Sequence, residues 1–174
     1  LMICSTQNFT GMLLKTVHTD IPKVLRPISM LGVTPYLLVV TPSLPPNSVK
    51  EFIEYAKSKP LVYASSGVGS AVHLAMELFK SMAKVQMSHV PYKGSSQSVV
   101  DLMSGRVQVA FTNTLTATPL VKSGKLKALG ITSAKRSANL PGIPTIAEGG
   151  VAGYESSTWY GLFAPMKTPA PVMN

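Results

Sequence analysis

The sequence predicts an α/β fold in which a mainly parallel sheet is covered by helices on both faces. Short apolar runs alternate with amphipathic helical patterns from about residue 36 onward. This order of elements favours parallel strands joined by right-handed connections. Hydrophobic residues make up 45% of the 174 residues and charged residues only 13%, so the chain has enough apolar side chain to bury a core.

The first elements carry the clearest local signals. Residues 36–40 form a β-rich apolar run between two prolines, which predicts a strand. Ser48 and Glu51 then form a capping box, which predicts the start of a helix that ends before Pro60.

The later elements continue the alternation. Further strands are expected over residues 61–64, 87–90, 106–111, 125–132 and 158–164. Further helices are expected over residues 70–82, 95–103, 114–122 and 145–148. The helix capped by Ser70 is expected to bury an apolar face formed by Ala71, Leu74, Ala75, Leu78, Phe79 and Met82.

The charge pattern favours a small anionic ligand over a nucleic acid. The chain has 16 Lys+Arg against 7 Asp+Glu and a formal net charge of +9, but no run of five basic residues. Proteins that read a phosphate backbone usually concentrate such charge on one face. Cys4 is the only cysteine, which excludes an internal disulfide and a cysteine-based zinc site. No stretch approaches the roughly 20 apolar residues that span a bilayer, so no membrane-spanning segment is expected.

Three loops that follow predicted strands share one composition. Residues 65–70, 91–95 and 112–114 are small and rich in hydroxyls, amides or glycine, and each leads into a predicted helix. Parallel strands bring such loops to one edge of the sheet, where free helix N–H groups favour an anion. Each loop alone is more typical of an ordinary β–α turn than of a binding site. The three together predict an anion-binding edge.

Catalytic and cofactor motifs are not evident. Gly67 and Gly69 are not followed by a third glycine at dinucleotide spacing, because position 72 is Val, and no Gly-Lys-Ser/Thr follows. His73, Glu77 and Lys80 share a helix face, which predicts a solvated polar stripe; the alternative is that His73 reaches a ligand. No nucleophile–base set, carboxylate pair or metal cluster stands out, so binding without a cofactor or metal is expected.

Several longer segments resemble one family of receptors. Residues 63–79 read YASSGVGSAVHLAMELF, and residues 89–95 read HVPYKGS. Residues 124–137 read GKLKALGITSAKRS, residues 140–148 read LPGIPTIAE, and residues 154–165 read YESSTWYGLFAP. In this order the segments resemble the solute-binding receptors of tripartite tricarboxylate transporters, also called Bug proteins.

The resemblance implies a type II periplasmic binding protein-like fold with two lobes that close on a ligand. On the family's pattern, residues 1–36 belong to part of lobe one, residues 37–158 form a nearly complete lobe two, and residues 159–174 return to lobe one. The opening residues, up to Cys4, are expected to be the middle of a buried strand. The chain is therefore expected to be a fragment cut at both ends, with a signal peptide upstream of it.

The resemblance also implies where a ligand would be held. The expected contacts are Ser5, Thr6, Ser66, Gly67, Gly69, Ser70, Tyr92, Lys93, Gly94, Thr112 and Asn113. Two departures from the family pattern bear on specificity. Residues 111–113 read FTN where many relatives read FDN, which favours a plain di- or tricarboxylate or an aromatic acid over an amino acid. Residues 5–8 read STQN in place of a run like TGTH, which alters the lobe-one contacts.

The function implied is that of a periplasmic receptor. It would capture a small organic acid and deliver it to the membrane permease of the transporter. Two alternatives remain open from the sequence: an orphan receptor that reports its ligand to a sensor kinase, and an enzyme on the same fold. The lack of catalytic motifs favours a protein that is not an enzyme.

Overall fold

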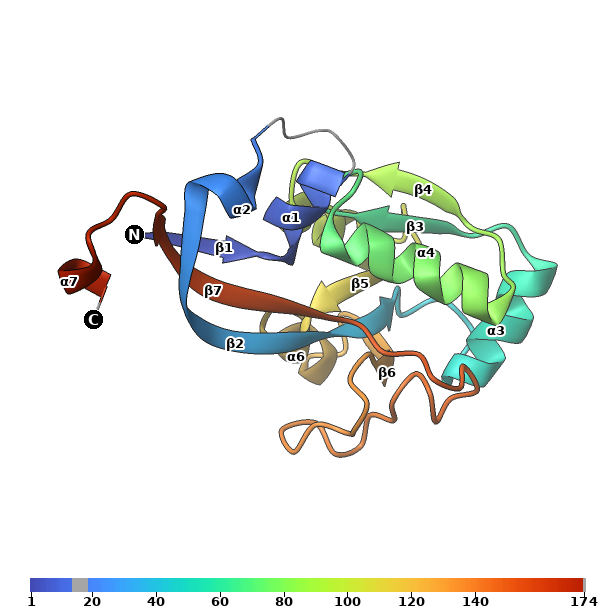
Figure 1. Cartoon of the computed structure of the whole chain (residues 1–174). Helices are drawn as coiled ribbons and strands as arrows, with labels where there is room; N and C mark the ends of the chain where they lie inside the picture. Colours follow the sequence, from blue (N-terminus) through green and yellow to red (C-terminus); the bar gives the residue numbers. More distant parts are fainter. Residues whose placement is uncertain (14–18, 174) are drawn as a thin grey trace.

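The computed structural model describes residues 1–13 and 19–173, and their strands join into one sheet (Figure 1). The strand order is β1-β7-β2-β5-β3-β4, with β6 paired to β2 off this path. The strands are β1 (Met2–Ser5), β2 (Leu25–Val40), β3 (Val62–Ser65), β4 (Ser88–Pro91), β5 (Val109–Asn113), β6 (Lys127–Ile131) and β7 (Ser157–Pro165). The helices are α1 (Thr6–Leu13), α2 (Ile21–Val24), α3 (Val49–Ser58), α4 (Ala71–Ala83), α5 (Ser95–Met103), α6 (Thr114–Lys122) and α7 (Ala170–Met173).

The long strand β2 divides the sheet into two halves. Its residues 25–35 pair with β7, which also pairs with β1; we call this the small half. Its residues 36–40 pair with β5 on one side and, over 37–40, with β6 on the other. These residues, β5, β6, β3 and β4 make up the large half. The change of partner falls between Pro35, opposite Ser157, and Tyr36, opposite Asn113.

The direction of β2 corrects one expectation. β3 runs parallel to both β4 and β5, as predicted. β2 runs antiparallel to both β5 and β6, so the prediction of a mainly parallel sheet is wrong there. β5 also lies between β2 and β3, although β2 and β3 are consecutive in the sequence. Apolar periodicity identifies a strand but carries no information about its direction.

The predicted helices of the large half are confirmed, and their caps are visible. Ser48 Oγ accepts a hydrogen bond from the Glu51 N–H at 3.2 Å at the start of α3. Ser70 Oγ accepts from the His73 N–H at 3.3 Å at the start of α4. Asn113 Oδ1 caps α6 in the same way. Each cap satisfies a backbone donor that the first helical turn leaves free.

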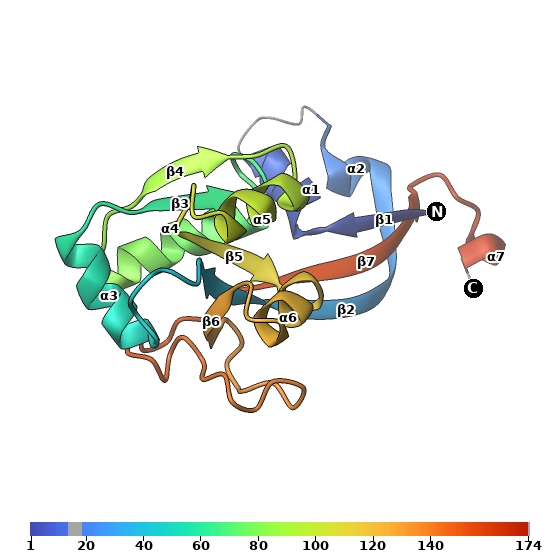
Figure 2. The same cartoon turned by 180° about the vertical axis from the view of Figure 1, so that it is seen from behind.

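The core lies on both faces of the large half. Leu38 and Val40 pack with α3 and α4 on one face, whereas Leu37 and Val39 pack with α5 and α6 on the other (Figures 1 and 2). Successive strand residues point to opposite faces, so a strand buried on both sides reads as a continuous apolar run. This explains the run over residues 36–40, all of which are nearly inaccessible to solvent.

The predicted apolar face of α4 is only partly correct. Ala75 and Phe79 are buried, but Leu74, Leu78 and Met82 are 37–43% exposed. The buried stripe instead includes Met76, which is 0% exposed. The apolar residues of α4 cover a wider part of the helix surface than the part it buries. Hydropathy alone therefore does not show which of these residues face the sheet.

The opening strand also differs from expectation. β1 forms, but Leu1, Met2 and Ile3 are 87%, 46% and 63% exposed, and only Cys4 is buried. The prediction that these residues lie in the middle of a buried strand is therefore wrong in this structure. β1 pairs only with β7 among the described residues, which leaves one of its edges and much of its surface open.

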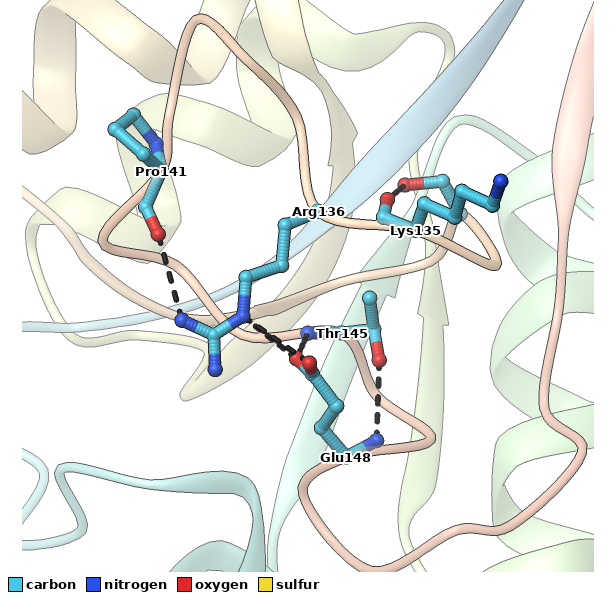
Figure 3. Close-up of polar contacts among 6 residues, drawn as sticks. Lys135, Arg136, Pro141, Thr145 and Glu148 are labelled. Carbon is cyan, nitrogen blue, oxygen red and sulfur yellow. Dashed lines mark hydrogen bonds and ion pairs between the residues drawn. The ribbon is translucent and has the colours of Figure 1, made fainter.

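The stretch expected to be a short helix at residues 145–148 is a turn. The Glu148 N–H donates to Thr145 Oγ1 at 3.0 Å, and the Thr145 N–H donates to Glu148 Oε2 at 2.7 Å. Gly149 and Gly150 follow, the latter at φ +113°, and the helical conformation stops after one turn. Arg136 Nε lies 2.9 Å from Glu148 Oε2 and joins the turn to the preceding loop (Figure 3).

Candidate ligand-binding cleft

A cleft of about 430 Å³ opens where the two halves of the sheet meet. The small half and the crossing strand contribute Ser5, Tyr36, Thr158 and Tyr160. The large half contributes Ser65, Ser66, Ala71, Val72, Lys93, Gly94, Ser95, Ser98, Phe111, Thr112 and Asn113. The second group lies at the carboxyl ends of β3, β4 and β5 and the starts of the helices that follow. This edge is where open α/β sheets hold ligands.

Six of the residues predicted from the sequence line this cleft. They are Ser5, Ser66, Lys93, Gly94, Thr112 and Asn113. They come from the two loops after β3 and β4 and from the ends of β1 and β5, so residues far apart in the sequence share one surface. Thr112 and Asn113 are the last residues of β5 and not a loop, because the strand continues to the N-cap of α6.

The other predicted residues of the loop after β3 lie behind the lining. Gly67 and Gly69 adopt φ values of +132° and +74°, which residues with a side chain rarely adopt. Ser70 is 1% exposed, and its hydroxyl caps α4. None of the three lines the cleft. Their position shapes the loop that carries Ser65 and Ser66 into the cleft.

Thr6 and Tyr92 also lie outside the lining. Thr6 Oγ1 accepts from the Trp159 N–H at 3.2 Å and lies 3.4 Å from Thr158 Oγ1, so it joins the start of α1 to β7. The Tyr92 hydroxyl donates to Asp101 Oδ2 at 2.7 Å and faces a separate surface hollow. Burial and the Asp101 carboxylate raise the pKa of Tyr92, which keeps the hydroxyl a donor.

The sequence analysis missed two tyrosines that line the cleft from the small-half side. Tyr36 stands at the changeover in β2, and Tyr160 follows in β7. Burial raises the pKa of Tyr36, so its phenol stays neutral. The alternation along a strand shows only whether such a residue is buried or exposed. The two tyrosines reach the cleft because β2 and β7 cross between the two halves of the sheet.

One side chain sets the electrostatics of the cleft. Lys93 is the only charged residue among the fifteen that line it. None of the ion pairs in residues 1–13 and 19–173 involves Lys93. The first turn of α5, which begins two residues later, contains no acidic side chain. An unpaired cation beside hydroxyls and a helix N-terminus creates a positive potential inside the cleft.

The polar stripe expected on α4 is a half-buried cluster and not a solvated face. The Tyr63 hydroxyl donates to Glu77. Lys80 Nζ bonds Glu77 Oε1 at 2.7 Å and lies 5.2 Å from the centre of the Tyr63 ring. His73 stacks on His89 with ring centroids 4.1 Å apart. The prediction of a solvated stripe is wrong because residues of β3 and β4 cover one side of it. His73 does not line the cleft.

No group of three or more His, Cys, Asp or Glu side chains within residues 1–13 and 19–173 is arranged to hold a metal ion. None of the helices in these residues is long and apolar enough to cross a membrane.

The fold and the cleft define the class as an α/β protein with a polar cleft where two halves of its sheet meet. Residues 3–174 match the model of the tripartite tricarboxylate transporter family receptors. The chain belongs to this family. The fold is that of its periplasmic binding proteins, as the comparisons with solved structures show.

Relatives and structures of known proteins agree with the family assignment. The chain is 36% identical over 151 residues to protein BugT of Bordetella pertussis, and the matched region covers 86% of this chain and 46% of BugT. It is 37% identical over 151 residues to a protein encoded between tcbD and tcbE in Pseudomonas sp. strain P51, covering 85% and 45% of the two chains. The chain thus spans about half the length of the curated relatives it matches.

Among solved structures, Rpa4515 of R. palustris with adipate superposes with a TM-score of 0.85 at 41% identity, covering 89% of this chain and 52% of that one. MatC of Rhodopseudomonas palustris with bound malate superposes with a TM-score of 0.85 at 28% identity, covering 98% and 60%. The periplasmic binding protein BugD superposes with a TM-score of 0.86 at 30% identity, covering 98% and 58%.

Proposed function

We propose that the chain forms much of an extracytoplasmic receptor that binds a small organic carboxylate in this cleft. The observation that carries the proposal is the lining itself. It combines neutral hydroxyl and amide groups with one cation, Lys93, which forms no ion pair with the residues that the structure describes. Such a cleft offers hydrogen bonds to several carboxylate oxygens and has no acidic side chain to repel them.

Two structural neighbours support the chemistry. Rpa4515 was solved with adipate and MatC with malate, and both of these ligands carry two carboxylates. We extend that ligand class to this chain as a proposal. The neutral Thr112 at the end of β5 favours a plain acid over an amino acid, because it offers no anion to pair with an ammonium group.

The site residues follow from the same argument. Ser5, Ser66, Lys93, Gly94, Thr112 and Asn113 would contact the ligand. Thr6, Gly67, Gly69, Ser70 and Tyr92 would shape the loops that surround it. Residues 1–36 and 159–174 would belong to one lobe and residues 37–158 to the other, with closure of the lobes around the ligand. The receptor would act in the periplasm and deliver its ligand, chemically unchanged, to a membrane permease.

A thermal-shift panel tests the proposal. The product of the complete reading frame containing these residues is screened against mono-, di- and tricarboxylates, with amino acids and neutral sugars as controls. A ligand at a hundredfold excess over its Kd adds about 2.7 kcal/mol to the free energy of unfolding. Stabilisation by carboxylates but not by sugars is expected. A flat response to every acid would contradict the proposal.

A further inference from the structure

Two histidines stack directly behind the loop that lines the cleft. His73 lies in the first turn of α4 and His89 in β4. Their ring centroids are 4.1 Å apart with an interplanar angle of 16°. The ring of Tyr63 also stacks on His89, with centroids 4.7 Å apart, and its centroid lies 6.3 Å from that of His73. Two imidazoles at this distance cannot both be charged without strong repulsion.

His89 holds one end of the loop. Its Nε2 lies 2.6 Å from Ser65 Oγ. Ser65 lines the cleft, and its Oγ also accepts a hydrogen bond from the Gly67 N–H at 3.1 Å. His89 therefore fixes the hydroxyl around which the loop turns.

His73 holds the other end of the loop. The Gly69 N–H donates to His73 Nδ1 at 3.1 Å. The carbonyl of Gly69 accepts from Thr10 Oγ1 of α1 at 3.1 Å, so Gly69 is also bonded to the helix that follows β1. A bond that uses the Nδ1 lone pair requires a neutral His73 whose proton is on Nε2.

We propose that His73 and His89 are positioning residues that hold residues 65–69 in their ligand-binding shape, and that protonation of His73 releases this loop. The inference rests on the proposed function of the cleft. A proton added to neutral His73 must go to Nδ1, which removes the acceptor of the Gly69 N–H. His89 differs, because a charged His89 can still donate from Nε2 to Ser65 Oγ.

The groups around the pair set the pH at which this occurs. Burial lowers the pKa of His73 and of His89 below the usual 6.5. Of the charged groups that face the pair, Glu77 raises both pKa values and Lys80 lowers them. Glu77 is itself bonded to Lys80 and to the Tyr63 hydroxyl, so the opposite effects of Glu77 and Lys80 on the histidine pKa values partly cancel. The loop is thus intact at pH 6.5 and above and loosens as the pH falls below that value.

Two variants of His73 separate this role from simple packing. In His73→Asn, the side-chain Oδ1 occupies about the position of Nδ1 and accepts from Gly69 without titrating. In His73→Leu, the acceptor is lost at every pH. The affinity for malate is measured by calorimetry on the product of the complete reading frame between about pH 5 and pH 8. Each variant is compared with the wild type at the same pH, so protonation of malate itself cancels.

The expected result is a different pH profile for each protein. His73→Asn binds malate within about threefold of the wild type at about pH 8. As the pH falls below 6.5, the wild type becomes progressively weaker relative to His73→Asn and approaches the loss seen in His73→Leu. His73→Leu binds about five- to tenfold more weakly throughout. Identical profiles for the wild type and His73→Asn would overturn the inference, as would normal affinity in His73→Leu.

A second readout needs no ligand. Hydrogen exchange of the Gly69 amide is compared between the wild type and His73→Asn at matched pH, which removes the intrinsic pH dependence of exchange. Loss of protection at low pH in the wild type alone is expected. Equal protection in both proteins would overturn the inference even if malate does not bind. Failure of every acid to bind, with the Gly69 result as expected, would instead count against the proposed function.

Discussion

Thr132 forms hydrogen bonds to both segments that cross between the halves of the sheet, β2 and the chain leading into β7. Replacing its side chain tests how much these bonds stabilise the crossing. The Tyr36 N–H donates to Thr132 Oγ1 at 2.8 Å, and Thr132 Oγ1 donates to the carbonyl of Ser156 at 2.5 Å. The backbone of Thr132 also bonds both residues. Tyr36 begins the large-half pairing of β2, and Ser156 immediately precedes β7.

The substitution Thr132→Val keeps the shape of the side chain and removes both hydroxyl bonds. Thr132 is 0% exposed, so water cannot replace the hydroxyl. An N–H and a carbonyl then lose their partner, and each unsatisfied buried group costs about 1–3 kcal/mol. We expect the free energy of unfolding to fall by about 2–4 kcal/mol.

Urea denaturation monitored by circular dichroism measures the change, with Thr132→Ser as the matched control. The serine keeps the hydroxyl and loses one methyl group, which costs roughly 1 kcal/mol. If Thr132→Val were no less stable than Thr132→Ser, the reasoning that the hydroxyl joins the crossing segments would be refuted.

Three further predictions concern the cleft, the core and the histidine pair. Lys93→Gln should weaken the binding of a dicarboxylate by about tenfold in calorimetry, since one charge-assisted contact is lost. The affinity for the half-amide of the same acid should be nearly unchanged. An equal loss of affinity for both compounds would contradict the role of the cation. Gly130→Ala places a Cβ 2.8 Å from a buried isoleucine methyl and should lower the free energy of unfolding by about 1–3 kcal/mol, whereas Gly142→Ala, with nothing within 4 Å, should not. The pKa values of the two stacked histidines are lowered in the folded state, so the unfolded chain takes up protons first as the pH falls. Stability measured by thermal denaturation should therefore be full above pH 6.5 and fall as the pH drops below it.

Much of the fold follows from local signals in the sequence. Caps at Ser48 and Ser70 and the apolar run over residues 36–40 predict elements that the structure contains. These signals act within a few residues, so they survive in any tertiary context. The direction of β2 and the position of β5 beside it could not be predicted in the same way. They depend on which strands meet in space, and strand periodicity does not encode partners.

The site shows the same division. Ser66 and Lys93 follow strands and Asn113 ends one, and the sheet brings them to one edge as predicted. Tyr36 and Tyr160 were missed because they lie within strands, and their exposure to the cleft depends on the crossing of β2 and β7. The histidine stack was also beyond sequence reasoning, since it needs the register that places β4 beside β3 and under α4.

Isothermal titration calorimetry of the product of the complete reading frame with dicarboxylates, followed by recovery of the ligand, tests whether the cleft binds a carboxylate without transforming it. We expect saturable binding of one acid per chain, weakened by Lys93→Gln, with the acid recovered chemically unchanged. No binding heat from any dicarboxylate, or recovery of the acid as a different compound, would contradict it.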